Sequence, residues 1–112
     1  LERYGSLGKK MHLAEIGSPS KGITLEFHED DLDWSTQPYE WHRHWDEELQ
    51  ADWLEDTFTI GYSKPFIEAT NWYDFADPFG FLKSGGIIRS INGEKKSACD
   101  RLVKLRKSFG NY

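Results

Sequence analysis

The segment "MHLAEIGSPS" (residues 11–20) runs through apolar residues to a glutamate and then breaks at once into Gly, Ser and Pro. Its apolar part, residues 11–16, lacks strict alternation, which is typical of a parallel strand covered on both faces. Glycine, serine and proline then indicate a loop. Glu15 therefore stands where a buried strand ends, and a carboxylate there must be paired, solvated or used in chemistry.

Further elements follow along the chain. The start, residues 1–10, reads as the end of a helix and a lead-in to the first strand. Asp46 can cap a helix over about 47–62, because acidic residues fill its first turn. Apolar and β-branched residues predict a second strand over 65–72, and an apolar stripe predicts a last helix over 96–107. Helices alternating with strands predict an α/β fold with parallel strands and a right-handed crossover.

The apolar positions within the two longer helices predict which faces are buried. Gly61 and Pro65 are expected to bracket the end of the first of these helices. The residues expected on the apolar faces are Leu49, Trp53, Leu54, Phe58 and Ile60 in the first, and Ala98, Cys99, Leu102, Val103 and Leu105 in the second.

The connecting segments are unequal in length. The loops that follow the strands, 17–45 and 73–86, are long and rich in aromatic residues, whereas the turns at 6–10 and 62–65 are short. In α/β folds, function concentrates at the carboxyl ends of the strands. We therefore expect the functional residues at that end, where Glu15 and Trp72 should emerge together.

Composition limits the classes of function. The chain has 112 residues, enough for one small domain, and a formal net charge of −5, so a nucleic-acid partner is not expected. The basic run at 101–107 is typical of a helix C-terminus. No apolar run approaches the ~20 residues of a membrane span, and no signal peptide is expected within these residues. A single cysteine, Cys99, excludes an internal disulfide and is expected as a buried free thiol.

Aromatic residues are abundant, with five Trp, five Tyr and seven Phe. Such a surplus often serves flat ligands such as sugar rings or bases. Glu15 can act on a substrate at a barrel mouth, or it can bond to backbone amides or to a lysine. Trp72 can be a platform for a sugar ring, or a core residue whose N–H is bonded locally.

The histidines give weaker signals. His28, His42 and His44 lie among acidic residues, but a His-Arg-His spacing in a loop is not specific for a metal, and no metal site is predicted. The acidic run at 28–33 lacks the Gly and Glu of a calcium loop and is interpreted as solvated. His12 is expected to be packed or hydrogen-bonded.

Three segments carry a resemblance to the C-terminal quarter of family-10 xylanases, which are (β/α)8 TIM barrels. "GKKMHLAEIGSPS" (8–20) is similar to the family's seventh strand, where a Thr-Glu carries the nucleophile. Residues 47–78 resemble the seventh helix and eighth strand. "GGIIRSINGEKKSACDRLVKL" (85–105) resembles the closing segment, in which a Pro-Lys-Pro-Ala-Tyr usually opens the last helix. This chain departs from the pattern at Ala14, which stands in place of Thr, and at "EKKSAC" (94–99).

The resemblance implies that the chain is strands 7 and 8 with helices 7 and 8 of a retaining endo-β-1,4-glycanase acting on xylan. It implies Glu15 as the nucleophile, and Trp72, Trp34, Trp41 and Trp45 as surfaces that bind the polysaccharide or oligosaccharide substrate. It implies no metal or organic cofactor and an extracellular location, since polymer substrates lie outside cells.

A typical barrel has ~250 residues, so we expect the remaining units, with the acid/base residue after the fourth strand, upstream of residue 1. The isolated chain is therefore expected to be inactive. The alternative is a small α/β module that binds carbohydrate or a partner without chemistry.

Overall fold

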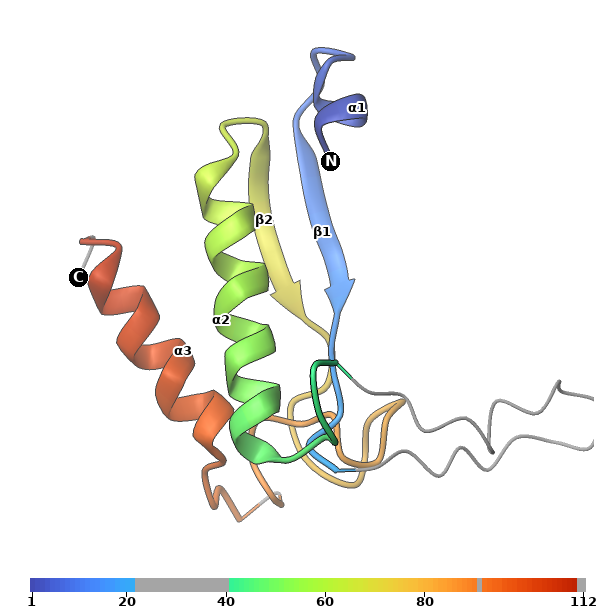
Figure 1. The fold of residues 1–112 in the computed structure, drawn as a ribbon, viewed down its shortest axis with the longest axis vertical. Coiled ribbons are helices and arrows are strands. Elements are labelled where there is room, and N and C mark those ends of the chain that lie inside the picture. The colour runs from blue at the N-terminus through green and yellow to red at the C-terminus, as the bar shows by residue number, and fades with distance from the viewer. Residues whose placement is uncertain (22–40, 91, 111–112) are drawn as a thin grey trace, which may run out of the picture.

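The structure, a computed structural model, describes residues 1–21, 41–90 and 92–110. These residues form a small α/β fold with two parallel strands and three helices (Figure 1). In chain order, the elements are α1 (Glu2–Gly5), β1 (Met11–Ile16), α2 (Glu47–Ser63), β2 (Ile67–Trp72) and α3 (Ser97–Ser108).

The two strands pair in parallel, as the sequence predicts. Leu13 lies opposite Thr70 and Ile16 lies opposite Trp72, with an irregularity in the register between these two pairs. In Figure 1 both arrows point down, α2 lies in front of the sheet and the chain moves from β1 on the right to β2 on the left. The crossover is therefore right-handed, the hand that nearly all such connections adopt.

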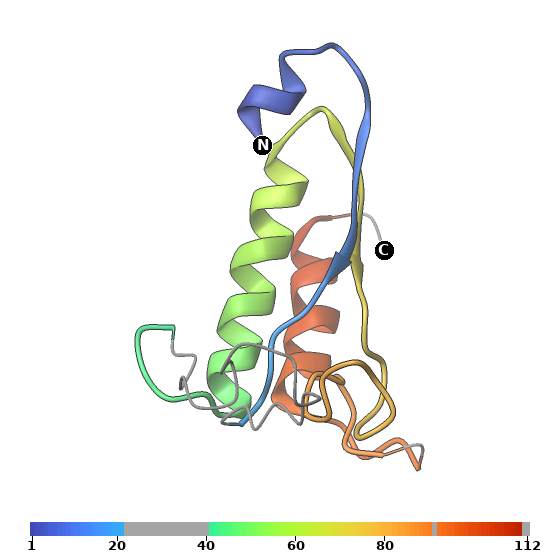
Figure 2. The same cartoon turned by 90° about the vertical axis from the view of Figure 1, so that its right-hand side faces the viewer.

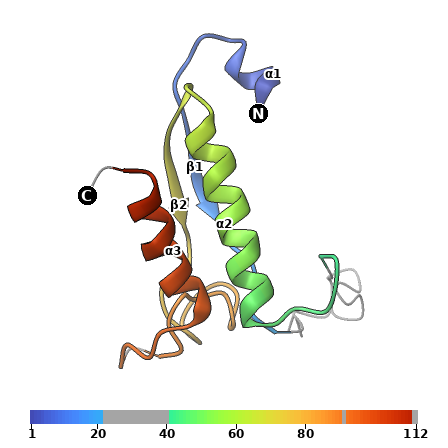
Figure 3. The ribbon, with the colours of Figure 1, turned by 60° about the vertical axis from the view of Figure 1, so that its left-hand side comes forward.

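Helix α2 packs on the sheet and α3 packs against α2. Figure 2 shows both helices on the same side of β1 and β2, and Figure 3 shows α3 beside α2. Among the described residues, no helix or strand covers the opposite face, and no helix is long and apolar enough to cross a membrane. Within the described ranges, the sheet is therefore asymmetric, with helices on one face and none on the other.

The core lies near the carboxyl end of the strands. It joins α2 and α3 to residues 87 and 88, which belong to the segment between β2 and α3. Burying one large aliphatic side chain of this kind contributes ~1.5–3 kcal/mol. The buried cluster is Ala51, Leu54, Ile87, Ile88 and Ala98, with Phe58, Trp72, Ala76, Cys99 and Leu102 packed against it.

Helix α2 begins and ends where the sequence predicts. Asp46 is its N-cap, and the Asp46 Oδ1 accepts a hydrogen bond of 2.7 Å from the Leu49 amide. The helix ends at Ser63, between Gly61 and Pro65, the two residues expected to bracket its end. A Cβ at Gly61 would lie 2.3 Å from the Thr70 Oγ1, so glycine is required here for close approach of the helix to β2.

Two residues predicted on apolar faces lie at the surface instead. Ile60 of α2 and Val103 of α3 are both exposed. Helical periodicity turns each of them away from the main buried face of its helix. The basic run is confirmed as a helix C-terminus, since Arg106 and Lys107 lie in the last turn of α3. Arg101, earlier in that run, binds carboxylates of α2.

Candidate functional site

A buried glutamine joins the loops that leave the two strands. Gln50, in the second turn of α2, is fully buried. Its Nε2 donates to the backbone oxygens of Ser18 at 3.0 Å, Ser84 at 3.3 Å and Gly86 at 3.2 Å. Ser18 follows β1, whereas Ser84 and Gly86 follow β2, so one side chain holds the two loops against each other.

A buried lysine binds the same loop from the other side. Lys96, the N-cap residue of α3, is only 1% exposed. Its Nζ donates to the Asp77 Oδ2 at 2.8 Å and to the backbone oxygens of Ser84 at 3.1 Å and Gly86 at 2.7 Å. Both donors stabilise the carboxyl end of the sheet, because they satisfy carbonyls that the loops would otherwise bury unpaired.

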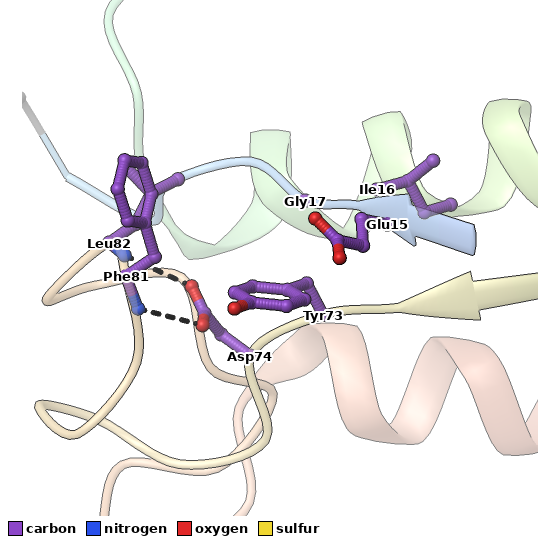
Figure 4. Close-up of a pocket in the computed structure, with 7 residues that line it drawn as sticks. All are labelled: Glu15, Ile16, Gly17, Tyr73, Asp74, Phe81 and Leu82. Carbon is purple, nitrogen blue, oxygen red and sulfur yellow. Dashed lines mark hydrogen bonds between the residues drawn. The ribbon is translucent and has the colours of Figure 1, made fainter. Parts of the chain in front are cut away.

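The loops enclose an open cleft of about 480 Å³ at this end of the sheet (Figure 4). Its volume falls within the range of small-molecule sites. Two aromatic rings and two carboxylates contribute to its walls, and none of the described residues that line it is basic. The lining residues are Glu15, Ile16, Gly17, Tyr73, Asp74, Phe81 and Leu82.

Glu15 lies in this cleft near the end of β1 and is exposed. No hydrogen bond or ion pair joins its side chain to any described residue, so neither backbone amides nor a lysine there engage it. The Tyr73 amide donates to the Ile16 backbone oxygen at 2.8 Å, which places Tyr73 beside the end of β1. Figure 4 shows the Tyr73 ring lying between the Glu15 and Asp74 side chains.

The cleft lies on the open face of the sheet. Trp72 packs against Trp53 of α2, with ring centroids 5.8 Å apart, so Trp72 points towards the helices. Successive residues of an extended chain point to opposite faces. The next residue, Tyr73, therefore points away from the helices, and Glu15, which lines the same cleft, does so too.

Trp72 does not form a wall of the cleft with Glu15. The two residues emerge at the same end of the sheet, as predicted, but the Trp72 ring is half-buried against Trp53 and its Nε1 donates to the Gly85 backbone oxygen at 2.9 Å. The alternation of β2 turns Trp72 towards α2. Tyr73 and Phe81 occupy the wall where the sequence led us to expect Trp72.

The other candidate tryptophans lie outside this cleft or outside the described residues. Trp41 and Trp45 precede α2, and their rings stack with centroids 6.4 Å apart. Neither is among the residues that line the cleft with Glu15. Trp34 and His28, with the rest of the acidic run at 28–33, fall outside the described residues, so their predicted roles stay predictions.

The described histidines and the cysteine lie away from the cleft. His42 and His44 are exposed, and the His12 Nε2 lies 3.2 Å from a carboxylate oxygen of Glu68 at the other end of the sheet. His12 is thus hydrogen-bonded, which is one of the two environments that the sequence predicts for it. Cys99 is a free thiol, half-buried against the core. No group of three His, Cys, Asp or Glu residues in the described ranges is arranged to hold a metal ion.

Sequence reasoning missed three lining residues: Tyr73, Asp74 and Phe81. The density of aromatic and glycine residues in 73–86 was a visible signal, but it did not distinguish the inward-facing residues from the rest. Asp74 is 5% exposed, and its two carboxylate oxygens accept hydrogen bonds from the amides of Phe81 at 2.9 Å and Leu82 at 3.1 Å. A buried aspartate shortly before a glycine-rich turn is the pattern that indicates such a contact.

No protein-family model matches this chain, and no curated protein matches it.

Proposed function

We propose that this chain supplies the nucleophile of a retaining endo-β-1,4-glycanase acting on xylan, as the last two βα units of a (β/α)8 barrel. One observation carries the proposal. Glu15 lies exposed at the carboxyl end of a parallel strand, inside a cleft with aromatic walls on the sheet face that the helices leave open.

That arrangement is the one a barrel requires. In a (β/α)8 barrel the helices form an outer ring, the strands face inward, and the active site lies at the carboxyl ends of the strands. Helices α2 and α3 cover one face only, so they suit the outer ring. The open face would then point into the barrel, with Glu15 at its mouth.

The chemistry needs a second carboxyl group. The Glu15 carboxylate would attack the anomeric carbon while an acid protonates the departing glycosidic oxygen, and a covalent glycosyl-enzyme forms. The same acid, now a base, would then take a proton from water, whose oxygen bonds to the anomeric carbon and releases Glu15. Asp74 is poorly suited to that role, because both of its oxygens already accept backbone hydrogen bonds.

The acid/base group is therefore assigned to a barrel unit outside this chain, after the fourth strand, about 5–5.5 Å from Glu15. The rings of Tyr73 and Phe81 suit the C–H faces of sugar rings. Trp34, Trp41 and Trp45 are proposed as more distant substrate surfaces, while Trp72 supports the site from behind. The mechanism needs no cofactor. Xylan as substrate, and an extracellular location, rest on the sequence resemblance.

Substitution of the nucleophile in the complete barrel tests the proposal. Glu15→Gln should lower kcat on an aryl xylobioside by about 10³-fold or more, because an amide cannot form the glycosyl-enzyme. Glu68→Gln is a matched control, since Glu68 is exposed near the opposite end of the same sheet. Turnover of Glu15→Gln close to that of the control would remove Glu15 from the mechanism.

The alternative function is a carbohydrate-binding module without chemistry. This alternative is supported by the number of available carboxylates. Among the described residues that line the cleft, only Glu15 has carboxylate oxygens that accept no hydrogen bond from the protein. The two functions differ in one measurement. A barrel that hydrolyses xylooligosaccharides and loses this activity with Glu15→Gln supports the enzyme, whereas oligosaccharide binding without hydrolysis in the complete protein supports the module.

A further inference from the structure

Asp74 is buried beneath the loop that closes one side of the cleft. It follows β2 by two residues, and its side chain reaches across to residues 81 and 82. The Phe81 amide donates to Oδ1 at 2.9 Å and the Leu82 amide donates to Oδ2 at 3.1 Å. Hydrogen bonds to an ionised acceptor are among the strongest in proteins. One side chain thus fixes the backbone of two consecutive loop residues (Figure 4).

Glycines allow the loop to fold this closely over the carboxylate. A Cβ at Gly80 would lie 2.1 Å from the Asp74 Oδ1, and a Cβ at Gly85 would lie 2.6 Å from Oδ2. No larger residue fits at either position unless Asp74 moves. The close packing of the loop on the Asp74 carboxylate therefore depends on glycine at both positions.

The consequence concerns Phe81, whose side chain is 75% exposed. An exposed ring on a loose loop would sample many positions and would lose that freedom on binding a ligand. Here the Asp74 carboxylate fixes the Phe81 amide. The C-terminal end of the same loop is fixed by the Asp77 Oδ1, which accepts a hydrogen bond from the Gly86 amide at 2.8 Å. Fixing a contact residue before binding raises affinity, because less conformational entropy is lost.

We propose that Asp74 is a positioning residue, which holds Phe81 at the wall of the cleft and so sets the affinity of the cleft for a sugar ring. Asp74 acts through the Phe81 and Leu82 amides and not by contact with the sugar. The nature of the ligand, a neutral xylooligosaccharide, rests on the proposed function. The positioning role itself rests on the hydrogen bonds and the glycine contacts.

Binding of xylotetraose to the isolated chain, followed by the amide resonances of Tyr73 and Phe81, tests the proposal without requiring hydrolysis. Asp74→Asn should raise Kd by about tenfold, because the Asn amide group cannot accept the second backbone hydrogen bond. Phe81→Ala should weaken binding to a similar extent. The double variant should bind no more weakly than Phe81→Ala alone, since contacts that act through one another are not additive.

Two further variants separate positioning from general stability. Gly80→Ala keeps the Asp74 carboxylate but displaces it, so this variant should reproduce the loss of affinity even where Asp74→Asn folds poorly. Asp56→Asn makes the same chemical change at an exposed position of α2 and should leave Kd unchanged. Additive losses in the double variant, or wild-type affinity in both Asp74→Asn and Gly80→Ala, would contradict the inference.

Failure of the positioning role can be distinguished from failure of the proposed function. Absence of xylotetraose shifts at Tyr73 and Phe81 in the wild-type chain would overturn the positioning role. If the complete barrel is inactive but binding follows the pattern above, the enzyme fails and the positioning role stands. If the barrel is active but Asp74→Asn binds as the wild type does, only the positioning role fails.

Discussion

At the carboxyl end of the sheet, buried polar side chains hold the loops, whereas at the amino end the turns are held by exposed contacts. Gln50 and Lys96 donate six hydrogen bonds in all to loop acceptors at the carboxyl end. At the amino end, the Lys10 Nζ donates to the Pro65 backbone oxygen at 3.0 Å, and Lys64 pairs with Glu2 at the surface.

The amino end also has a groove of about 430 Å³, next to the stacked rings of Tyr62 and Phe109. No residue of α1, which lies at that end, is buried. The short turns there need little support, because they expose their backbone to water. The long loops at the other end must bury backbone to hold a cleft in shape, and buried carbonyls need donors. Rigid loops therefore mark the end of the sheet that carries the candidate site.

The largest expected effect is that of removing the buried lysine. Lys96→Met should lower the free energy of unfolding by about 3–5 kcal/mol, because the change leaves the Asp77 carboxylate and two carbonyls without their cationic donor. Urea unfolding of the isolated chain measures it.

The matched control is Arg89→Met. Arg89 pairs with Glu47 and Glu94, but at the surface, where solvent screens such pairs and they contribute little to stability. Equal losses in the two variants would mean that the buried network does not distinguish the carboxyl end. Adding Asp77→Asn to Lys96→Met should recover part of the loss, because the unpaired charge is then removed.

A smaller effect is expected where α2 meets the middle of β2. Gly61→Ala should lower the free energy of unfolding by about 1–3 kcal/mol, because the new methyl group would overlap the Thr70 Oγ1. Alanine is otherwise the better helix former, so a stabilised Gly61→Ala would show that α2 can move away from the sheet at no cost. In the Thr70→Ala background, the Gly61→Ala change should be milder, since the clashing oxygen is gone.

The sequence predicted the elements that local patterns specify. The apolar run ending at Glu15 gave β1 with its observed bounds, and Asp46 gave the start of α2. The parallel pairing and the shared end of Glu15 and Trp72 followed from the alternation of elements. These features depend on residues close together in the chain, or on topological rules that hold across α/β folds.

The residues that shape the cleft could not be predicted in the same way. The burial of Gln50 depends on carbonyls 32, 34 and 36 residues away along the chain. The burial of Lys96 depends on carbonyls 10 and 12 residues away. From sequence alone, a polar residue on a helix is expected to be exposed to solvent, because the groups that it contacts in the folded protein are not known. The face of the sheet on which the Trp72 side chain lies depends on the register of β2 against β1. That register shifts at an irregularity between Leu13 and Ile16. The close approach of Gly61 to Thr70 is likewise a tertiary contact, which the local sequence around the helix end does not indicate.

The smallest expected effect concerns the cap of α2, where the loop before the helix joins the carboxyl end. A hydrogen bond from Arg43, and then one from the Leu49 amide, lower the pKa of Asp46 below its usual value of 3.8. The folded state therefore holds the Asp46 proton less tightly than the unfolded state. Its stabilisation is fully present above about pH 3.8 and is lost as the pH falls through the lowered pKa.

Two substitutions separate the charge from the cap. Asp46→Asn keeps an acceptor for the Leu49 amide but loses the Arg43 ion pair, which is exposed, so it should cost less than about 1 kcal/mol at pH 7. That difference should shrink as the pH falls below 3.8, because the unfolded state then binds a proton at Asp46 more readily than the folded state does. Asp46→Ala also removes the cap and should cost about 1 kcal/mol more than Asp46→Asn at pH 7. Unfolding curves of the three proteins at pH 7 and at a pH below 3.8 measure this, and a wild type whose advantage over Asp46→Asn grows on acidification would contradict the sign of the pKa shift.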